Sequence, residues 1–129
     1  MSTHALYVFK DKHDTLKVYG HCDGYPTGAT EQILKSFEKS WELGRYEASD
    51  FAAAFVAANK TYGGGVYIVN KTKMGVDYRY VIEPPSFDSN LQPIVTAYTL
   101  QGDGFFGRPK KIWKGPLDRM TDWAKTYKC

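Results

Sequence analysis

The sequence has little cysteine and histidine and no long hydrophobic run. Cys22 and Cys129 are the only cysteines among 129 residues, too few for a disulfide framework, which favours a reducing compartment. No apolar stretch approaches the roughly 18 residues that span a bilayer. The N-terminal residues also lack a basic leader followed by an apolar run. We therefore expect a cytoplasmic protein with no membrane association.

Motifs of the common enzyme and cofactor-binding classes are also missing. The stretch "YGGGVY" follows a predicted helix and precedes a predicted strand, the reverse of the order in a phosphate-binding loop. His21 and Cys22 are sequence neighbours, so on a strand their side chains point to opposite faces and form no nucleophile–base pair. No serine stands in a nucleophile elbow, and nothing in the sequence brings Asp23 and Asp103 together. These absences predict a protein without catalytic residues and without a cofactor.

The sequence is rich in tyrosine and carries a slight, unevenly distributed positive charge. Ten tyrosines contribute to an aromatic content of 16%, which suits half-exposed aromatic surfaces as well as core packing. The formal net charge is +3. Residues 1–64 hold seven Lys/Arg against eight Asp/Glu, and residues 65–129 hold ten against six. Any basic surface must therefore be local.

Residues 5–10 and 15–19 are aromatic and β-branched segments separated by a polar turn, and they predict a β-hairpin. A turn centred on Lys12 and His13 places residues whose numbers sum to 25 opposite each other. The predicted pairs are Tyr7–Val18 and Phe9–Leu16 on an apolar face, and Leu6–Tyr19, Val8–Lys17 and His4–His21 on the other face. The pair His4–His21 lies beside Cys22 or Asp23, and zinc accepts side chains of these types as ligands. The sequence has no HxxxH or CxxC spacing that would support a metal site. We predict no metal.

Two helices are predicted in the centre of the chain. Thr27 or Gly28 is expected to cap the first helix, with Glu31 in its first turn, and Gly44 to end it. A second, alanine-rich helix is expected to start at Ser49 and to be broken by three glycines. The apolar residues expected to face the core are Ile33, Leu34, Phe37 and Trp41 in the first helix and Phe51, Phe55 and Val56 in the second.

The second half of the chain is predicted to be β-rich. Residues 66–70 and 76–83 flank a short connection and predict a second hairpin. Alternation predicts that one face of the second of these strands is apolar, formed by Val76, Tyr78, Tyr80 and Ile82. Residues 93–100 predict a further strand, and residues 111–113 a last short one.

The chain is predicted to end in a helix that Gly115 and Pro116 open, with proline at its first position. Its apolar stripe comprises Leu117, Met120, Ala124 and Tyr127. The sequence therefore predicts one α+β domain over residues 1–129. Its antiparallel sheet has about five strands, from an N-terminal hairpin and a C-terminal meander, packed with two central helices and the C-terminal helix.

The segment "YGHCDGYPTGA", residues 19–29, connects the first hairpin to the first helix and has two interpretations. In the structural one, Asp23 and Gly24 form a turn whose carboxylate accepts backbone N–H groups, and Pro26 holds Tyr25 extended. In the functional one, free N–H groups and the dipole at the helix N-terminus favour an anion such as a nucleotide or phosphate. The ligand-binding residues are then Tyr19, His21, Asp23 and Tyr25.

The same segment resembles the YxHxDGYPxG signature of a family of small proteins encoded by phages and prophages. The matching residues are Tyr19, His21, Asp23, Gly24, Tyr25, Pro26 and Gly28. Cys22 stands where that family carries an aromatic residue, often Trp, and "FAAAFVAANKTYGGG" is a looser match. The resemblance implies a phage-type accessory or anti-defence factor that acts in the host cytoplasm by binding a host protein.

Residues 104–115, "GFFGRPKKIWKG", hold four basic residues and no acidic one. Basic side chains interleaved with aromatic rings suit single-stranded nucleic acid, because the charges follow phosphates and the rings stack on bases. They also suit docking on an acidic protein surface, or a hairpin whose aromatic rings face the core while its lysines stay in solvent. The candidate binding residues in this segment are Arg108, Lys110, Lys111 and Trp113.

Together these features predict a non-enzymatic cytoplasmic binding protein. A host protein is the first expected partner. A nucleotide or small anion bound at the bend is the alternative, and nucleic acid bound at residues 104–115 is a third.

Overall fold

The computed structural model describes residues 3–42, 45–70, 76–100 and 109–127. These residues form a six-stranded sheet, three α-helices and two short 3-10 helices, which confirms the predicted α+β class. In chain order the elements are β1 (Ala5–Lys10), β2 (Thr15–Gly20), α1 (Pro26–Lys35), η1 (Ser36–Lys39), α2 (Ala48–Asn59), β3 (Val66–Val69), β4 (Tyr78–Glu83), β5 (Ile94–Thr99), β6 (Lys110–Pro116), η2 (Leu117–Arg119) and α3 (Met120–Thr126).

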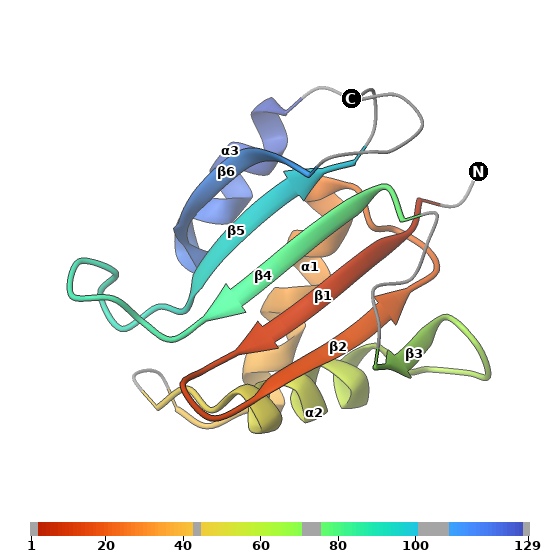
Figure 1. Ribbon diagram of the computed structural model, residues 1–129, viewed down its shortest axis with the longest axis horizontal. Coiled ribbons are helices and arrows are strands. Elements are labelled where there is room, and N and C mark those ends of the chain that lie inside the picture. The colour runs from red at the N-terminus through yellow and green to blue at the C-terminus, as the bar shows by residue number, and fades with distance from the viewer. Residues whose placement is uncertain (1–2, 43–44, 71–75, 101–108, 128–129) are drawn as a thin grey trace.

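The strands follow the order β3-β2-β1-β4-β5-β6 across the sheet (Figure 1). β1 and β4 are parallel, and the other neighbouring pairs are antiparallel. The predicted antiparallel sheet is therefore wrong in one respect, because the described sheet is mixed; its six strands include all the predicted segments, the short last one among them. The parallel pair forms because β2, two helices and β3 separate β1 from β4 in the chain, a connection long enough for a crossover.

The N-terminal hairpin has the predicted register. Tyr7 lies opposite Val18, Leu6 opposite Tyr19 and Phe9 opposite Leu16. The predicted neighbours His4 and His21 also meet, with ring centroids 4.4 Å apart. A short turn between two strands of strict alternation leaves one register that buries the apolar face, so local sequence was sufficient here.

The second predicted hairpin is wrong. β3 pairs with β2 and β4 pairs with β1, so two strands stand between them. The alternation within β4 was correct, since Tyr78, Tyr80 and Ile82 are all buried. Alternation determines which face of a strand is buried, but it does not determine the neighbour with which the strand pairs.

The three α-helices lie behind the sheet in Figure 1, on one face of it. The hydrophobic core lies between this face and the helices, and its largest fully buried side chains include Tyr7, Phe9, Ile33, Phe55, Tyr80, Ile82 and Met120. Burying side chains of this size contributes roughly 1.5–3 kcal/mol each before conformational entropy is subtracted. The three α-helices are thereby held on the sheet.

The first helix is shorter than predicted and starts without the predicted cap. It begins at Pro26, and its N-cap is Tyr25, which makes no side-chain cap hydrogen bond. α1 ends at Lys35 and continues only as η1, so Trp41 lies beyond both helices and is 45% exposed. The predicted end at Gly44 falls outside the described residues.

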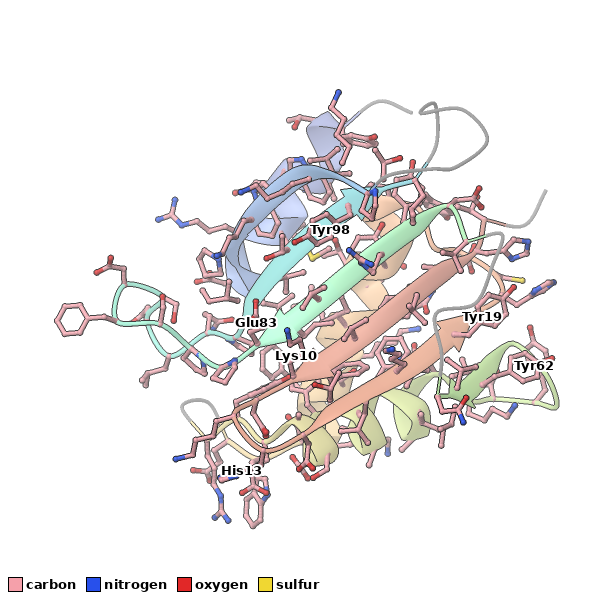
Figure 2. The ribbon with its side chains drawn as sticks, in the orientation of Figure 1. Lys10, His13, Tyr19, Tyr62, Glu83 and Tyr98 are labelled. Atoms are coloured by element: carbon pink, nitrogen blue, oxygen red, sulfur yellow. The ribbon has the colours of Figure 1, made fainter. Side chains whose placement is uncertain are left out.

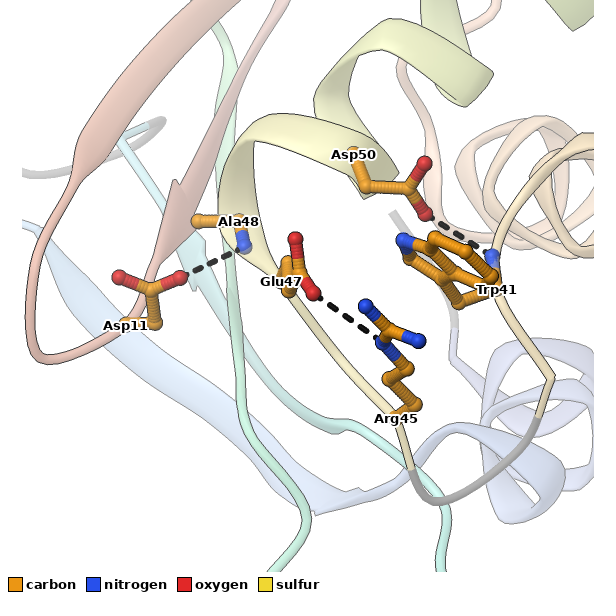
Figure 3. Close-up of polar contacts among 6 residues, drawn as sticks. All are labelled: Asp11, Trp41, Arg45, Glu47, Ala48 and Asp50. Atoms are coloured by element: carbon orange, nitrogen blue, oxygen red, sulfur yellow. Dashed lines mark hydrogen bonds and ion pairs between the residues drawn. The ribbon is translucent and has the colours of Figure 1, made fainter.

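The second helix begins within one residue of its predicted start, at Ala48. Its first turn is held by contacts from other parts of the chain (Figure 3). The Asp11 carboxylate, in the β1–β2 turn, accepts the backbone N–H of Ala48 at 2.8 Å. Asp50 accepts the backbone N–H of Trp41 at 2.9 Å. The two contacts tie α2 to the hairpin turn on one side and to the end of η1 on the other.

The C-terminal segment differs from its prediction mainly in where the strand ends. β6 is longer than predicted and runs through Pro116, so this proline ends a strand and does not occupy the first position of α3. The chain then forms η2 and α3. The predicted apolar stripe is confirmed, because Leu117, Met120 and Ala124 are buried and Tyr127 packs against the core.

Candidate functional site

The bend between β2 and α1 is clamped to the start of β1 and to β4. The backbone N–H of Gly24 donates to the carbonyl oxygen of Thr3 at 2.9 Å. The buried Tyr80 hydroxyl donates to the Gly24 carbonyl at 2.7 Å. A Cβ atom on Gly24 would lie 2.7 Å from the Cβ of Ala5, so only glycine fits here.

Asp23 makes the turn through its backbone, in a left-handed conformation with φ of 59°. Its carbonyl oxygen accepts a hydrogen bond from the Gln32 side chain at 3.2 Å, and a Cβ on Gly28 would lie 2.3 Å from that oxygen. The predicted hydrogen bonds from backbone N–H groups to the Asp23 carboxylate do not form among the described residues. Tyr25 is extended before Pro26, as predicted. Asp23 is exposed, and it lines the pocket beside the bend.

A pocket of about 200 Å³ lies beside this bend, and we call it the bend pocket. It is lined by Cys22, Asp23, Gln32, Lys35, Ala58, Asn59, Thr61, Tyr62, Gly64, Gly65 and Val66. Residues of the bend and of the segment between the end of α2 and β3 therefore line one pocket. They are joined directly, because the backbone N–H of His21 donates to the Gly65 carbonyl at 2.8 Å.

The glycine segment that follows α2 is held in place by Lys60. Gly64 and Gly65 have φ angles of 79° and 80°, which L side chains rarely adopt. The ammonium group of Lys60 donates to the carbonyl oxygens of Gly64 at 2.8 Å and Val66 at 3.0 Å. Gly64 and Gly65 therefore contribute main-chain atoms, held in a defined conformation, to the wall of the bend pocket.

A cluster of His4, Tyr19 and His21 lies where β1 begins and β2 ends. The Nδ1 of His4 is 2.7 Å from the His21 carbonyl oxygen, which assigns the proton to that nitrogen. The Tyr19 hydroxyl lies 3.0 Å from the Nδ1 of His21 and 3.1 Å from the Nδ1 of His4. Burial raises the pKa of Tyr19, and the nearby ionisable groups of Tyr67, Cys22 and Asp77 add to the rise. No group of three or more metal-type ligands occurs among the described residues.

The face of the sheet opposite the helices forms a second candidate surface, the open face (Figure 2). Strand pairing places six side chains in one row across it: Tyr67, Tyr19, Leu6, Arg79, Tyr98 and Lys111. The next row comprises Val69, Lys17, Val8, Val81, Thr96 and Lys114. Lys10 and Glu83 continue the alternation at the ends of β1 and β4. At about 4.8 Å per strand, the first row extends about 24 Å.

The open face is basic. In its rows and at their ends on β1 and β4, five described residues are Lys or Arg and one, Glu83, is acidic; Asp77, which accepts the backbone N–H of His4 at 2.9 Å, adds a second carboxylate at the edge of the face. The Arg79 guanidinium lies 4.9 Å from the centroid of the Tyr98 ring, and its buried Nε has no hydrogen-bond partner in the part of the chain that the structure describes. Leu6, Val8, Tyr19 and Thr96 are buried and Arg79 and Tyr98 are half-buried, so the exposed members of the face are Tyr67 and the lysines Lys10, Lys111 and Lys114.

The predicted site residues fall into separate groups. Tyr19 and His21 belong to the histidine cluster, Asp23 lines the bend pocket, and Tyr25 is 39% exposed at the start of α1. Lys110 and Lys111 lie on β6, at the opposite edge of the sheet from β3. Arg108 lies outside the described residues.

Trp113 has a packing role. Its ring stacks on Trp123 of α3, with centroids 5.2 Å apart and an interplanar angle of 11°. It also packs against the core. The segment 110–115 belongs to strand β6, which contains and extends the short strand predicted at residues 111–113. The interpretation in which Trp faces the core is confirmed for Trp113.

Sequence reasoning missed Arg79, Tyr98 and Tyr67 as candidate binding residues. The available indication was the alternation within β4, which predicted that Arg79 points away from the buried face. It could not predict that β5 and β6 would add Tyr98 and Lys111 to the same row, because that depends on strand neighbours.

No family model, no curated protein and no solved structure matches this chain. Among the described residues, no helix combines the length and the hydrophobicity needed to cross a bilayer.

Proposed function

We propose that this protein is a non-enzymatic binding protein that recognises an acidic protein surface through the open face. The observation that carries this proposal is the row across six strands that places Arg79, Tyr98 and Lys111 side by side. Tyrosine and arginine are enriched at the centre of protein interfaces, and lysines around them select an acidic partner. The phage-type resemblance of the bend supports a host protein as that partner, in the host cytoplasm.

The geometry of the tyrosines favours a protein partner over single-stranded nucleic acid. Base stacking needs exposed ring faces. Tyr19 is only 7% exposed, and the ring of Tyr98 has the Arg79 guanidinium against it. Trp113, the other aromatic candidate, is stacked on Trp123. The open face therefore suits a protein surface, which is recognised through buried area and charge, better than it suits single-stranded nucleic acid, which needs exposed rings for base stacking.

The size of the open face is adequate for a protein interface. Its first row extends about 24 Å, and strands of six residues extend about 20 Å in the other direction. This gives a central patch of roughly 500 Å², against about 800 Å² that each partner buries in a standard complex. The surrounding lysine side chains and the histidine cluster would supply the rim.

Charge reversal on the open face tests this proposal. The double variant Lys111→Glu/Lys114→Glu changes two exposed side chains of β6. The matched control Lys39→Glu/Lys125→Glu makes the same change in net charge on η1 and α3, away from the open face. Both should keep the far-UV circular dichroism spectrum and the melting temperature of the wild type.

In pull-downs from nuclease-treated host lysate, the wild type and the control should capture the same defined protein, and the open-face variant should lose it. A captured protein that the open-face variant retains would contradict the proposal. So would capture that occurs only in untreated lysate and that weakens steeply with salt, because this would identify nucleic acid as the ligand.

A further inference from the structure

The bend pocket combines three different recognition groups from three segments. Asp23 contributes a carboxylate from the bend, Lys35 an ammonium group from the last turn of α1, and Tyr62 an aromatic ring from the segment before β3. Among the described residues, none of these three side chains makes a hydrogen bond or an ion pair. Their polar groups are therefore available to a bound molecule.

The two charged side chains line the pocket from different elements, Asp23 from the bend and Lys35 from α1. The Asp23 carbonyl contacts Gln32, and Lys35 follows Gln32 by three residues on the same helix. Side chains three residues apart on a helix have Cβ atoms about 5–6 Å apart. A ligand that contacts both side chains therefore needs a hydrogen-bond donor for the Asp23 carboxylate and an anionic group for the Lys35 ammonium group.

The third group lies at the mouth of the pocket. Tyr62 is 68% exposed, so a flat ring can lie against it without entering the cavity. The adjoining wall is formed by Gly64 and Gly65, whose lack of a side chain lets a ligand approach the backbone. The cavity of about 200 Å³ is small for a whole nucleotide and large enough for a sugar phosphate.

We propose that the bend pocket binds a ribonucleotide. The Asp23 carboxylate accepts hydrogen bonds from the ribose hydroxyls, the Lys35 ammonium group holds the phosphate, and the base stacks on Tyr62. This differs from an anion bound at the N-terminus of α1, because the cation of the pocket stands in the last turn of that helix. The site is separate from the open face, so its test does not depend on the proposed function.

Isothermal titration calorimetry with AMP, adenosine, ribose 5-phosphate and 2′-deoxy-AMP tests each contact. Lys35→Ala should raise the Kd for AMP about 10-fold or more and leave the Kd for adenosine unchanged. Tyr62→Ala should raise the Kd for AMP about 10-fold and leave ribose 5-phosphate unaffected, while Tyr62→Phe should retain AMP binding. Asp23→Asn should weaken AMP more than it weakens 2′-deoxy-AMP.

Lys39→Ala is the matched control, since Lys39 is exposed on η1 and does not line the pocket. It should bind AMP as the wild type does. Absence of saturable binding by all four probes would overturn the proposal. An equal loss in the Lys39→Ala variant, or AMP binding that persists unchanged in both Lys35→Ala and Tyr62→Ala, would overturn it as well.

Discussion

The hydroxyl of Tyr80 on β4 donates a buried hydrogen bond of 2.7 Å to the carbonyl oxygen of Gly24 in the bend. These residues are 56 positions apart in the chain. The contact fixes the bend to the centre of the sheet, and thereby positions both the bend pocket and the histidine cluster. The sequence motif around Gly24 therefore depends on a tyrosine that lies far outside it.

Tyr80→Phe should lower the free energy of unfolding by about 1–3 kcal/mol, because it leaves the Gly24 carbonyl buried without a donor. Chemical denaturation at neutral pH measures this change. Tyr98→Phe is the control, since its ring, which the Arg79 guanidinium faces, stays in place. Equal effects of the two variants would show that the Tyr80 hydrogen bond is not the cause.

The contact between Asp11 and α2 should make stability depend on pH. The backbone N–H of Ala48, followed by those of His13 and Asp14, lowers the pKa of the Asp11 carboxyl below its ordinary value of 3.8. A pKa that is lower in the folded protein stabilises the fold at pH values above 3.8, and this stabilisation is lost as pH falls through the folded value.

Asp11→Asn should therefore be less stable than the wild type at pH 6, with a difference that shrinks below pH about 3.8. Urea unfolding across this range measures it. Asp14→Asn is the control, because the Asp14 side chain makes no hydrogen bond to another described residue. A difference that stays constant down to low pH would contradict the assigned role of the Asp11 charge.

Gly28→Ala should reverse the usual effect of alanine in a helix. Alanine normally stabilises a helix by about 1 kcal/mol relative to glycine. At this position its Cβ would lie 2.3 Å from the Asp23 carbonyl oxygen, so we expect destabilisation of roughly 1–3 kcal/mol. Thr27→Ala, at the exposed neighbouring position, should be close to neutral in the same thermal unfolding assay. A stabilised Gly28→Ala variant would refute this close approach.

The stacked pair of Trp113 and Trp123 should be energetically coupled. Aromatic pairs contribute about 0.5–1.5 kcal/mol beyond their buried area. A double-mutant cycle with Trp113→Leu and Trp123→Leu should give a coupling energy in this range, because the rings are nearly parallel at 5.2 Å. Strictly additive losses would mean that each ring packs independently against the core.

Local patterns predicted those features that depend on residues close together in the chain. The hairpin register followed from a short turn and strict alternation, and the stripe from Leu117 to Ala124 followed from helical spacing. The end of the first helix was predicted too late. Apolar spacing continues to Trp41, but the N–H of Trp41 is bound by Asp50 of α2, and this tertiary contact is not encoded in the local pattern.

The candidate site was predicted only in part, because part of it depends on contacts between segments that are distant in the sequence. The bend was identified from its residues, and the structure places Asp23 in a pocket and Tyr19 with His21 in a cluster. The opposite wall of the pocket, with Asn59 and Gly65, and the alignment of Arg79 with Tyr98 depend on which segments become neighbours.

By itself the sequence determined the type of most elements, the buried faces of β1, β2 and β4 and the presence of a tight, glycine-dependent bend, because periodicity and turn chemistry act between nearby residues. Only the tertiary structure decided that β4 joins β1 in parallel, that the bend meets the glycine segment, and that cations and tyrosines line up on the open face. Strand order depends on how the whole sheet packs against the three helices. This packing consists of contacts between residues that are far apart in the sequence.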